Sequence, residues 1–324
     1  MTPRRRAALA VALWPPAVTA AALVWVFSFL DELPETVVTH WGTGGVPDGF
    51  TSREAAPWYA LIGLALGWGI GALVLALAHH DGIQRRLGVG IAAGTATFVS
   101  TTMASTLWIQ RGVATGAEIS GEDLAVTMSL VAALVLGFVA AWTVPGVEAD
   151  DATATGPVPA HAPRAGLRGG DATWSGMARP ARSIWVLLVA LPPFFAGLAW
   201  VTGMWLFPLV IGVIVVLLAL GFSMFRVRVG DDGLVVRGAL GVPTWRIPLA
   251  DVAQADVTEV DPLWQFGGWG YRLGMDGRTG FVVRKGPALE VTRGDGARWV
   301  VTVDGAEEAA GLLNSLAERD RTSR

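Results

Sequence analysis

Apolar residues are gathered into six long runs, and none of these runs contains a charged side chain. A helix rises 1.5 Å per residue, so about 20 residues cross a hydrocarbon layer of about 30 Å. Each run has about that length, and the pattern therefore predicts a membrane-embedded, all-α helical bundle of six spans. The predicted spans are residues 7–30, 57–78, 87–109, 124–144, 183–201 and 205–225.

The first run follows Arg4, Arg5 and Arg6, a start that cleaved signal peptides and retained anchor helices share. The apolar region of a signal peptide is roughly 7–15 residues long. This run is longer, and no polar break follows its small residues 20–22. We therefore expect a retained helix.

The distribution of arginine predicts the orientation of the spans, because short cytoplasmic loops carry an excess of Lys and Arg. Basic residues gather before the first span, between the second and third, and between the fourth and fifth. Of the alternate loops, the one after the first span carries only Arg53 and the one after the third carries only Arg111. The loop after the fifth span carries no basic residue. The prediction is a multi-pass protein of the inner or plasma membrane with both termini in the cytoplasm.

Glycines recur at a spacing of four in two spans, at Gly63, Gly67 and Gly71 and at Gly90 and Gly94. This spacing puts small residues on one helix face, where a second helix can approach closely. Packing within the bundle is the favoured interpretation. Self-association through the same face is the alternative.

The period of the pattern changes from that of a helix to that of a strand at residue 225. Residues 225–229 and 234–237 alternate between apolar and polar, and Asp232 and Gly233 between them form a strong hairpin signal. Further turn signals follow at residues 241–243, 276–277 and 295–296. The pattern predicts about seven strands.

One amphipathic helix is expected after these strands. Asp304 is its predicted N-cap, with Glu307 at the third helical position. The apolar residues that follow have helical spacing. They are Ala309, Leu312, Leu313 and Leu316.

The segment between the fourth and fifth spans is rich in Ala, Gly, Pro and Asp and has few large apolar residues. Such a composition predicts a flexible cytoplasmic linker over residues 146–182. The expected organisation is then a four-span module (1–145, with an outer loop at 31–56), this linker, a two-span helical hairpin (183–225) and a cytoplasmic β-rich domain (226–324).

Composition narrows the classes of function. Only 16% of the residues are charged and 52% are hydrophobic, and the net charge of −3 gives no indication of a nucleic-acid partner. The chain has no cysteine, so disulfides, thiolate metal sites and cysteine nucleophiles are excluded. The preference for Arg, Ala and Gly over Lys is typical of GC-rich genomes such as those of actinobacteria.

The absence of certain residues and motifs also carries information. No ionisable residue lies in the middle of a span, which disfavours ion-coupled transporters and pumps. No nucleophile elbow, phosphate loop, dinucleotide fingerprint or zinc-protease motif is present. We therefore expect neither an enzyme nor a bound cofactor.

The outer loop contains an extended piece that ends at His40 and Trp41, followed by the turn residues Pro47, Asp48 and Gly49. His40 and Asp48 can approach each other across this turn and share a proton. The alternative is that His40 and Trp41 are anchors in the membrane interface while Asp48 stabilises its own turn. Zinc sites normally show at least three protein ligands, so no metal site is predicted. The candidate binding residues are His40, Trp41, Pro47 and Asp48.

A second candidate site lies in the β-rich domain, where glycines separate the aromatic residues Trp264, Phe266 and Trp269. These side chains either contact the inner leaflet or adjacent helices, or cap the open end of the β-structure. From residue 226 onward the chain has 13 Lys/Arg and 14 Asp/Glu. Recognition of lipid head groups depends on concentrated positive charge, so a module for protein interaction or assembly is predicted instead.

The residues of the outer loop resemble those of the domain of unknown function 1648. The resemblance comprises Pro34, the segment Val-Val-Thr-His-Trp at 37–41, the segment Gly-Val-Pro-Asp-Gly at 45–49, and Arg53, where lysine is common in the family. It covers about residues 10–80. This domain opens the immunity proteins that protect Bacillus-like cells from a secreted sporulation-delaying toxin. The resemblance implies a membrane module whose outer loop matters, and it implies no activity.

The C-terminal part is similar to bacterial pleckstrin-homology-like domains, which often follow a two-span hairpin. The similarity covers about residues 183–318 and rests on the stretch 225–237 and on Trp-Arg-Ile-Pro-Leu-Ala-Asp-Val at 245–252. It implies a pleckstrin-homology-like fold of about seven strands and one helix.

Two classes of function remain open. One is a membrane protein of sensing or immunity type, whose outer loop contacts a peptide or an envelope component and whose cytoplasmic domain mediates assembly. The other is a non-catalytic scaffold or channel-like protein that acts through oligomerisation. Both have the lipid bilayer as a partner, and neither involves nucleic acid.

Overall fold

The computed structural model describes residues 2–42, 45–77, 82–113, 119–144, 153–166, 172–239, 241 and 244–324. The chain divides into two compact units. Unit 1 comprises Met1–Glu148 and Phe194–Ile211, and unit 2 comprises Ala149–Pro193 and Gly212–Arg324.

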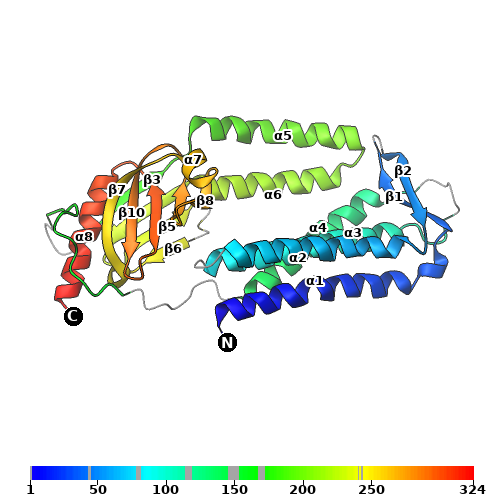
Figure 1. The fold of residues 1–324 in the computed structure, drawn as a ribbon. Coiled ribbons are helices and arrows are strands. Elements are labelled where there is room, and N and C mark those ends of the chain that lie inside the picture. The colour runs from blue at the N-terminus through cyan, green and yellow to red at the C-terminus, as the bar shows by residue number, and fades with distance from the viewer. Residues whose placement is uncertain are drawn as a thin grey trace. The chain divides into compact units, whose positions relative to one another are not determined.

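Unit 1 contains a bundle of four helices that carries a small β-hairpin at one end (Figure 1), and it also includes Phe194–Ile211. Helix α3 packs against α1, α2 and α4 and is therefore the centre of the bundle. The helices are α1 (Pro3–Phe27), α2 (Ala60–Leu77), α3 (Gly82–Trp108) and α4 (Glu122–Trp142), with short 3-10 helices η1 (Leu30–Glu32) and η3 (Ala56–Tyr59). The hairpin consists of β1 (Thr36–Trp41) and β2 (Pro47–Ser52).

The small residues of the spans lie where helices approach most closely. A Cβ at Gly63 or Gly67 of α2 would come within 2.9 Å of a backbone oxygen of α3. A Cβ at Gly90 of α3 would come within 2.9 Å of the backbone oxygen of Gly137 in α4. These glycines therefore serve packing within the bundle, as the favoured interpretation of their spacing predicts.

Five helices among the described residues are long and apolar enough to cross a membrane, judged by length and composition. They are Arg4–Phe27, Ala56–Ala76, Arg85–Trp108, Glu122–Trp142 and Ile184–Thr202, the last of which belongs to α5 (Arg182–Thr202). The sixth predicted span corresponds to α6 (Leu206–Ser223), whose apolar part, Leu206–Gly221, is shorter than 18 residues. The apolar run overstates this helix because Trp205 precedes it and Phe225 already belongs to the next strand.

Unit 2 contains the C-terminal β-rich region, in which nine strands among the described residues form two sheets. The first sheet has the order β3 (Trp174–Ala178), β4 (Phe225–Gly230), β5 (Gly233–Gly238), β6 (Thr244–Ile247). The second has the order β7 (Val252–Val260), β10 (Gly286–Arg293), β11 (Arg298–Thr302), β9 (Thr279–Val282), β8 (Gly270–Leu273). Neighbouring strands are antiparallel except β9 and β11, which run parallel. The short elements η4 (Leu249–Asp251) and α7 (Pro262–Phe266) precede and follow β7.

Helix α8 (Ala306–Thr322) packs against β7 and β10. The predicted apolar stripe of Ala309, Leu312, Leu313 and Leu316 is buried, which confirms the helix and its inward face. The predicted N-cap is wrong. Gly305, with φ of 75°, occupies the cap position, and the carboxylate of Asp304 instead forms an ion pair with Arg284.

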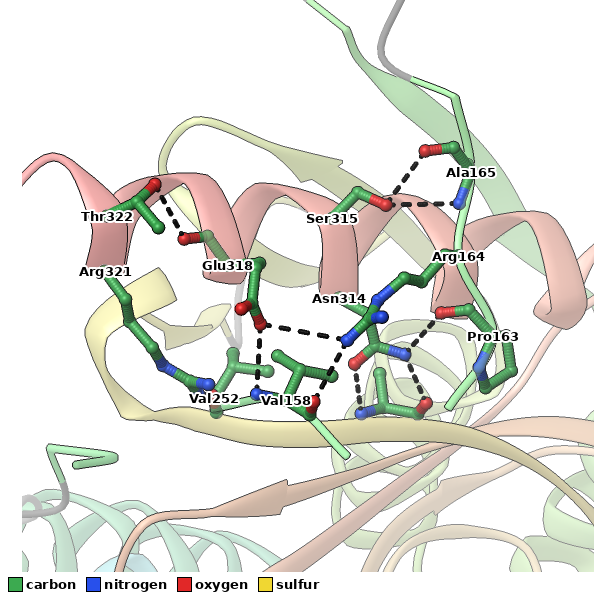
Figure 2. Close-up of polar contacts among 11 residues, drawn as sticks. Val158, Pro163, Arg164, Ala165, Val252, Asn314, Ser315, Glu318, Arg321 and Thr322 are labelled. Atoms are coloured by element: carbon green, nitrogen blue, oxygen red, sulfur yellow. Dashed lines mark hydrogen bonds and ion pairs between the residues drawn. The ribbon is translucent and has the colours of Figure 1, made fainter. Parts of the chain in front are cut away.

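The segment predicted as a flexible linker differs from that prediction wherever the structure describes it. Strand β3 pairs with β4 along its whole length. Residues 153–166 lie along α8, where the N–H of Val158 donates to Glu318 at 3.0 Å and the N–H of Ala165 donates to Ser315 at 3.1 Å (Figure 2). The small apolar side chains of Ala154, Val158 and Ala162 are buried. Residues 146–152 and 167–171 of the predicted linker lie outside the described residues.

Candidate functional site

The hairpin β1–β2 presents the outer-loop residues that the sequence singles out. Its strands are antiparallel, with Val38 opposite Phe50, His40 opposite Gly49 and Trp41 opposite Pro47. The register shifts on both sides of His40. Such irregularities redirect side chains, and here they turn His40 toward the strand that carries Asp48.

His40 and Asp48 form a hydrogen-bonded pair across the two strands. Nδ1 of His40 donates to Oδ1 of Asp48 at 2.5 Å. The two side chains are 71% and 55% exposed, so the pair lies on the surface of the hairpin. The structure thus brings together the two titratable residues of the predicted site.

Two glycines make room for this pair. A Cβ at Gly42 would lie 2.5 Å from Oδ2 of Asp48, and a Cβ at Gly49 would lie 2.7 Å from Cβ of His40. A larger residue at position 42 therefore shifts the carboxylate of Asp48, and a larger residue at position 49 crowds the Cβ and the backbone N of His40. Turn chemistry alone does not indicate this role.

The hairpin is held to the bundle by the side chain of Gln110, which follows α3. Its Oε1 accepts from the N–H of Val38 at 2.7 Å, and its Nε2 donates to the C=O of Val38 at 2.9 Å and to the C=O of Thr106 at 2.9 Å. Gln110 is buried, so these bonds are shielded from water. The side-chain amide of Gln110 therefore bonds to the edge of β1 as the backbone of a neighbouring strand would.

An apolar cluster lies beneath the hairpin and fixes its base. Val37 of β1 is fully buried and packs with residues of α1, η3 and α3. The other buried members of this cluster are Ala22, Val26, Phe29, Leu33, Ala56, Ala104 and Leu107. The hydrogen bonds of Gln110 and this apolar cluster both fix the base of the hairpin. The exposed pair of His40 and Asp48 is therefore held in a defined position.

Trp41 and Pro47 lie opposite each other next to the exposed pair. Both are partly buried, and Nε1 of Trp41 is enclosed without a hydrogen-bond partner. They therefore support the hairpin more than they extend its exposed face.

The tip of the hairpin lies near the start of α4 and the connection between α5 and α6. A Cβ at Gly45 would come within 3.9 Å of Glu122 and of the C=O of Thr202. Beside it, the carboxylate of Asp123 accepts from the N–H groups of Trp205, Leu206 and Phe207 at 2.9, 2.7 and 2.8 Å. Asp123 thus caps α6 from another helix.

Gln110 and Asp123 are residues that sequence reasoning missed. Their only signal is a polar residue at the boundary of an apolar run, which is common and unspecific. Their partners are 72 and 82–84 positions away along the chain.

The hairpin carries one imidazole and one carboxylate, His40 and Asp48. Among the described residues, no group of three or more His, Asp or Glu side chains is arranged to hold a metal ion. The pair and the second ring nitrogen of His40 lie at the surface of the hairpin.

The aromatic residues of the second candidate site do not form one cluster. Phe266 is 4% exposed and belongs to the core with Val260, Val282, Ala288 and Val300. Trp264 is 79% exposed and Trp269 is 37% exposed. Phe266 is therefore a structural residue, and only the two tryptophans are accessible to a partner.

Residues around Trp264 hold α7 in place. Asp261 accepts from the N–H groups of Leu263 and Trp264 at 3.2 and 3.4 Å, and its carboxylate lies 3.1 Å from Nζ of Lys285. The hydrogen bond from Lys285 is the main cause that holds the pKa of Asp261 below its ordinary value, and the N–H groups of α7 add to it.

The space between the two sheets of unit 2 is filled by aromatic side chains. The rings of Trp245 and Phe281 are 4.3 Å apart, and Tyr271 stacks on Trp245 at 5.1 Å. The remaining cavity there has a volume of about 10 Å³. That is room for about one water molecule, so this interior is a core and not a ligand pocket.

Comparisons with known proteins bear on the hairpin. Residues 17–64 match the model of the family described as domain of unknown function 1648 (DUF1648). The match spans the second half of α1, the hairpin and the start of α2, and includes His40, Trp41, Pro47 and Asp48. The resemblance noted in the sequence is thereby confirmed for this part of the chain.

An uncharacterized protein of Archaeoglobus fulgidus is 57% identical to this chain over 37 residues. These residues are 11% of this chain and 20% of that protein, so the similarity concerns one segment of each. No solved structure matches the chain.

Proposed function

We propose that this is a membrane protein of sensing or immunity type, whose hairpin β1–β2 contacts a peptide or an envelope component outside the membrane. The observation that carries the proposal is the exposed His40–Asp48 pair on a hairpin whose base is fixed by buried contacts. Binding residues are commonly carried by loops on a rigid scaffold. The immunity proteins that the DUF1648 segment resembles give the proposal its direction.

The edge of β2 supports a peptide as the contacting partner. Val38 directs its N–H and C=O to Gln110, away from β2, so Val38 and Phe50 form a non-hydrogen-bonded pair of the ladder. The N–H and C=O of Phe50 then point to the outer edge of β2. An extended peptide pairs with such an edge and adds a strand to the sheet.

The exposed side chains at this edge are suited to such a partner. Phe50 and Val46 are exposed apolar residues beside the polar His40–Asp48 pair. Main-chain bonds along β2 supply affinity, and these side chains supply selectivity for residues of the peptide.

We further propose that both termini are cytoplasmic and that the protein resides in the plasma membrane. The distribution of arginine between the loops supports this orientation. In the proposed orientation the hairpin lies on the outer side. The tail of unit 2 is then cytoplasmic.

For the C-terminal β-rich region we propose a pleckstrin-homology-like fold that mediates assembly and has no catalytic role. Two sheets with one C-terminal helix support the proposal. The nine strands found among the described residues and the parallel pair β9–β11 go beyond the expected plan of about seven strands. The near balance of 13 basic and 14 acidic residues from residue 226 onward supports a protein partner over lipid head groups.

The test is complementation of a deletion strain, after a screen for sensitivity to envelope stress and peptide toxins. His40→Ala and Asp48→Ala are expected to lose complementation while the amount of protein in the membrane stays normal. Thr36→Ala, an exposed change at the far end of β1, is the matched control and is expected to complement fully.

Full complementation by both variants would contradict the proposal, and so would a loss that follows only from reduced protein. In either case the hairpin is structural. The second candidate function, a non-catalytic scaffold or channel-like protein that acts through oligomerisation, would then account better for the chain.

A further inference from the structure

Large apolar side chains are exposed on α7 and on the loop that follows it. Leu263, Trp264 and Trp269 project there, and Met275 is exposed beside them. Phe266 of the same segment is buried in the apolar cluster beneath, whereas these side chains lie outside that cluster. We refer to Leu263, Trp264 and Trp269 as the apolar ridge.

The apolar ridge lies at the end of unit 2 that carries α5 and α6. Helix α6 leads through Met224 into Phe225, whose ring lies 5.0 Å from that of Phe281 in β9. Ala181 directly precedes α5, and its N–H donates to the C=O of Val283 at 3.2 Å. Val283 directly follows β9.

The strand register places α7 at the same end of unit 2 as the connections to α5 and α6. Gly270, which follows Trp269, is paired with Val282, and Val260, two residues before Pro262, is paired with Gly286. Figure 1 shows α7 and β8 at the side of the domain from which α5 and α6 leave. The apolar ridge and both helix connections therefore share one end of the unit.

The apolar ridge is held in a defined conformation. Asp261 caps α7 at its start, Gly267 ends it with φ of 66°, and the N–H of Met275 donates to the C=O of Gln265 at 3.1 Å. Phe266 fixes the opposite side of α7 in the core. The tryptophans are thus presented outward by a fixed support.

We propose that the apolar ridge rests in the interfacial region of the lipid bilayer that α5 and α6 enter. Tryptophan favours this region because its ring is apolar and its N–H is polar. Insertion removes Leu263 and Trp264 from water, and the burial of apolar surface is favourable. The contact fixes the β-rich domain against the membrane surface.

The charges near the apolar ridge indicate that this contact is apolar and not specific for a head group. The ammonium of Lys285 is paired with Asp261, and Arg272 donates to the C=O of Trp269 at 3.0 Å. The exposed arginines of the first sheet, Arg226, Arg228, Arg237 and Arg246, lie on β4, β5 and β6 and not on α7. The contact is therefore expected on zwitterionic as well as anionic bilayers.

The absence of cysteine allows a direct test in the full-length protein. Leu263→Cys is labelled with a nitroxide after reconstitution into phosphatidylcholine bilayers, and its collisions with oxygen and with a water-soluble nickel complex are compared by electron paramagnetic resonance. Oxygen concentrates in lipid and the nickel complex in water. We expect a higher ratio of oxygen to nickel collisions for this label than for a control label at Asp232.

Asp232 is the matched control because it is exposed in the turn after β4, at the opposite end of that strand from Phe225. The strand separates the two ends by roughly 17 Å at about 3.3 Å per residue. Trp264→Ser together with Trp269→Ser should shift the Leu263 label toward the behaviour of the control. Val257→Ser, an exposed apolar change on β7, should not.

Three outcomes overturn the proposal. A Leu263 label that is as accessible to the nickel complex as the Asp232 label shows that the apolar ridge is in water. A label shielded from both reagents shows that protein covers it, either another part of the chain or a second copy. A lipid contact that appears only when phosphatidylglycerol is added contradicts the apolar character inferred above.

Discussion

Gln110 and Val38, 72 residues apart in the chain, pair through hydrogen bonds as two strand residues would. The same device recurs in unit 2, where buried Asn314 accepts from the N–H of Ala255 at 2.8 Å and donates to its C=O at 2.7 Å. Asn314 also donates to the C=O of Pro163 at 2.9 Å (Figure 2). In both units a buried side-chain amide bonds to the backbone of a strand residue.

The pairing predicts that Gln110→Ala loosens the hairpin. The change leaves the N–H and C=O of Val38 without partners in a buried place, which costs about 1–3 kcal/mol for each unsatisfied group. We expect faster hydrogen–deuterium exchange across residues 36–52 of the reconstituted protein. The exposed change Thr36→Ala should leave exchange unaltered, and equal exchange in both variants would show that Gln110 does not hold the hairpin.

Asp123 predicts a graded effect at the start of α6. Asp123→Ala removes the acceptor of three N–H groups, and loss of a cap typically costs about 0.5–2 kcal/mol. Asp123→Asn keeps one oxygen and should fall between Ala and the parent. Exchange of the amides of Trp205 to Phe207 measures this order.

Glu122→Ala is the matched control for that series, since Glu122 is the neighbouring carboxylate and does not accept from these amides. If Glu122→Ala loosens α6 as much as Asp123→Ala does, the capping role of Asp123 is refuted.

In unit 2, Asn314→Asp tests the second amide. Aspartate keeps the acceptor for the N–H of Ala255 but has no donor for the C=O groups of Ala255 and Pro163. We expect a loss of stability of about 1–3 kcal/mol or more, because a charge is also buried. Thermal unfolding followed by limited proteolysis of unit 2 measures it, with the exposed change Glu307→Ala as control.

The arginine distribution predicts the sidedness of the protein. Reporter fusions that are active only outside the cytoplasm should be silent at residue 160 and at the C-terminus, and active near residues 45 and 117. A signal at residue 160 would overturn the orientation, and with it the placement of the hairpin outside the membrane.

Much of the fold follows from short-range patterns in the sequence. Apolar runs locate five helices among the described residues that are long enough to cross a membrane, because the length and the composition of a segment can be read directly from the sequence. Alternation and the turn at Asp232 and Gly233 locate β4 and β5, and the stripe around Leu313 locates α8. The candidate residues of the outer loop also follow from the sequence, since turn chemistry and the DUF1648 resemblance both indicate His40 and Asp48.

Only the tertiary structure decided which polar side chains complete these elements. Gln110 and Asp123 gain their roles from backbone groups 72 to 84 residues away, and Val158 meets Glu318 across 160 residues. Composition likewise misjudged β3 and residues 153–166, because their hydrogen bonds are satisfied by β4 and α8 and not by neighbours in the chain. Local periodicity carries no record of such partners, since they exist only once distant segments pack together.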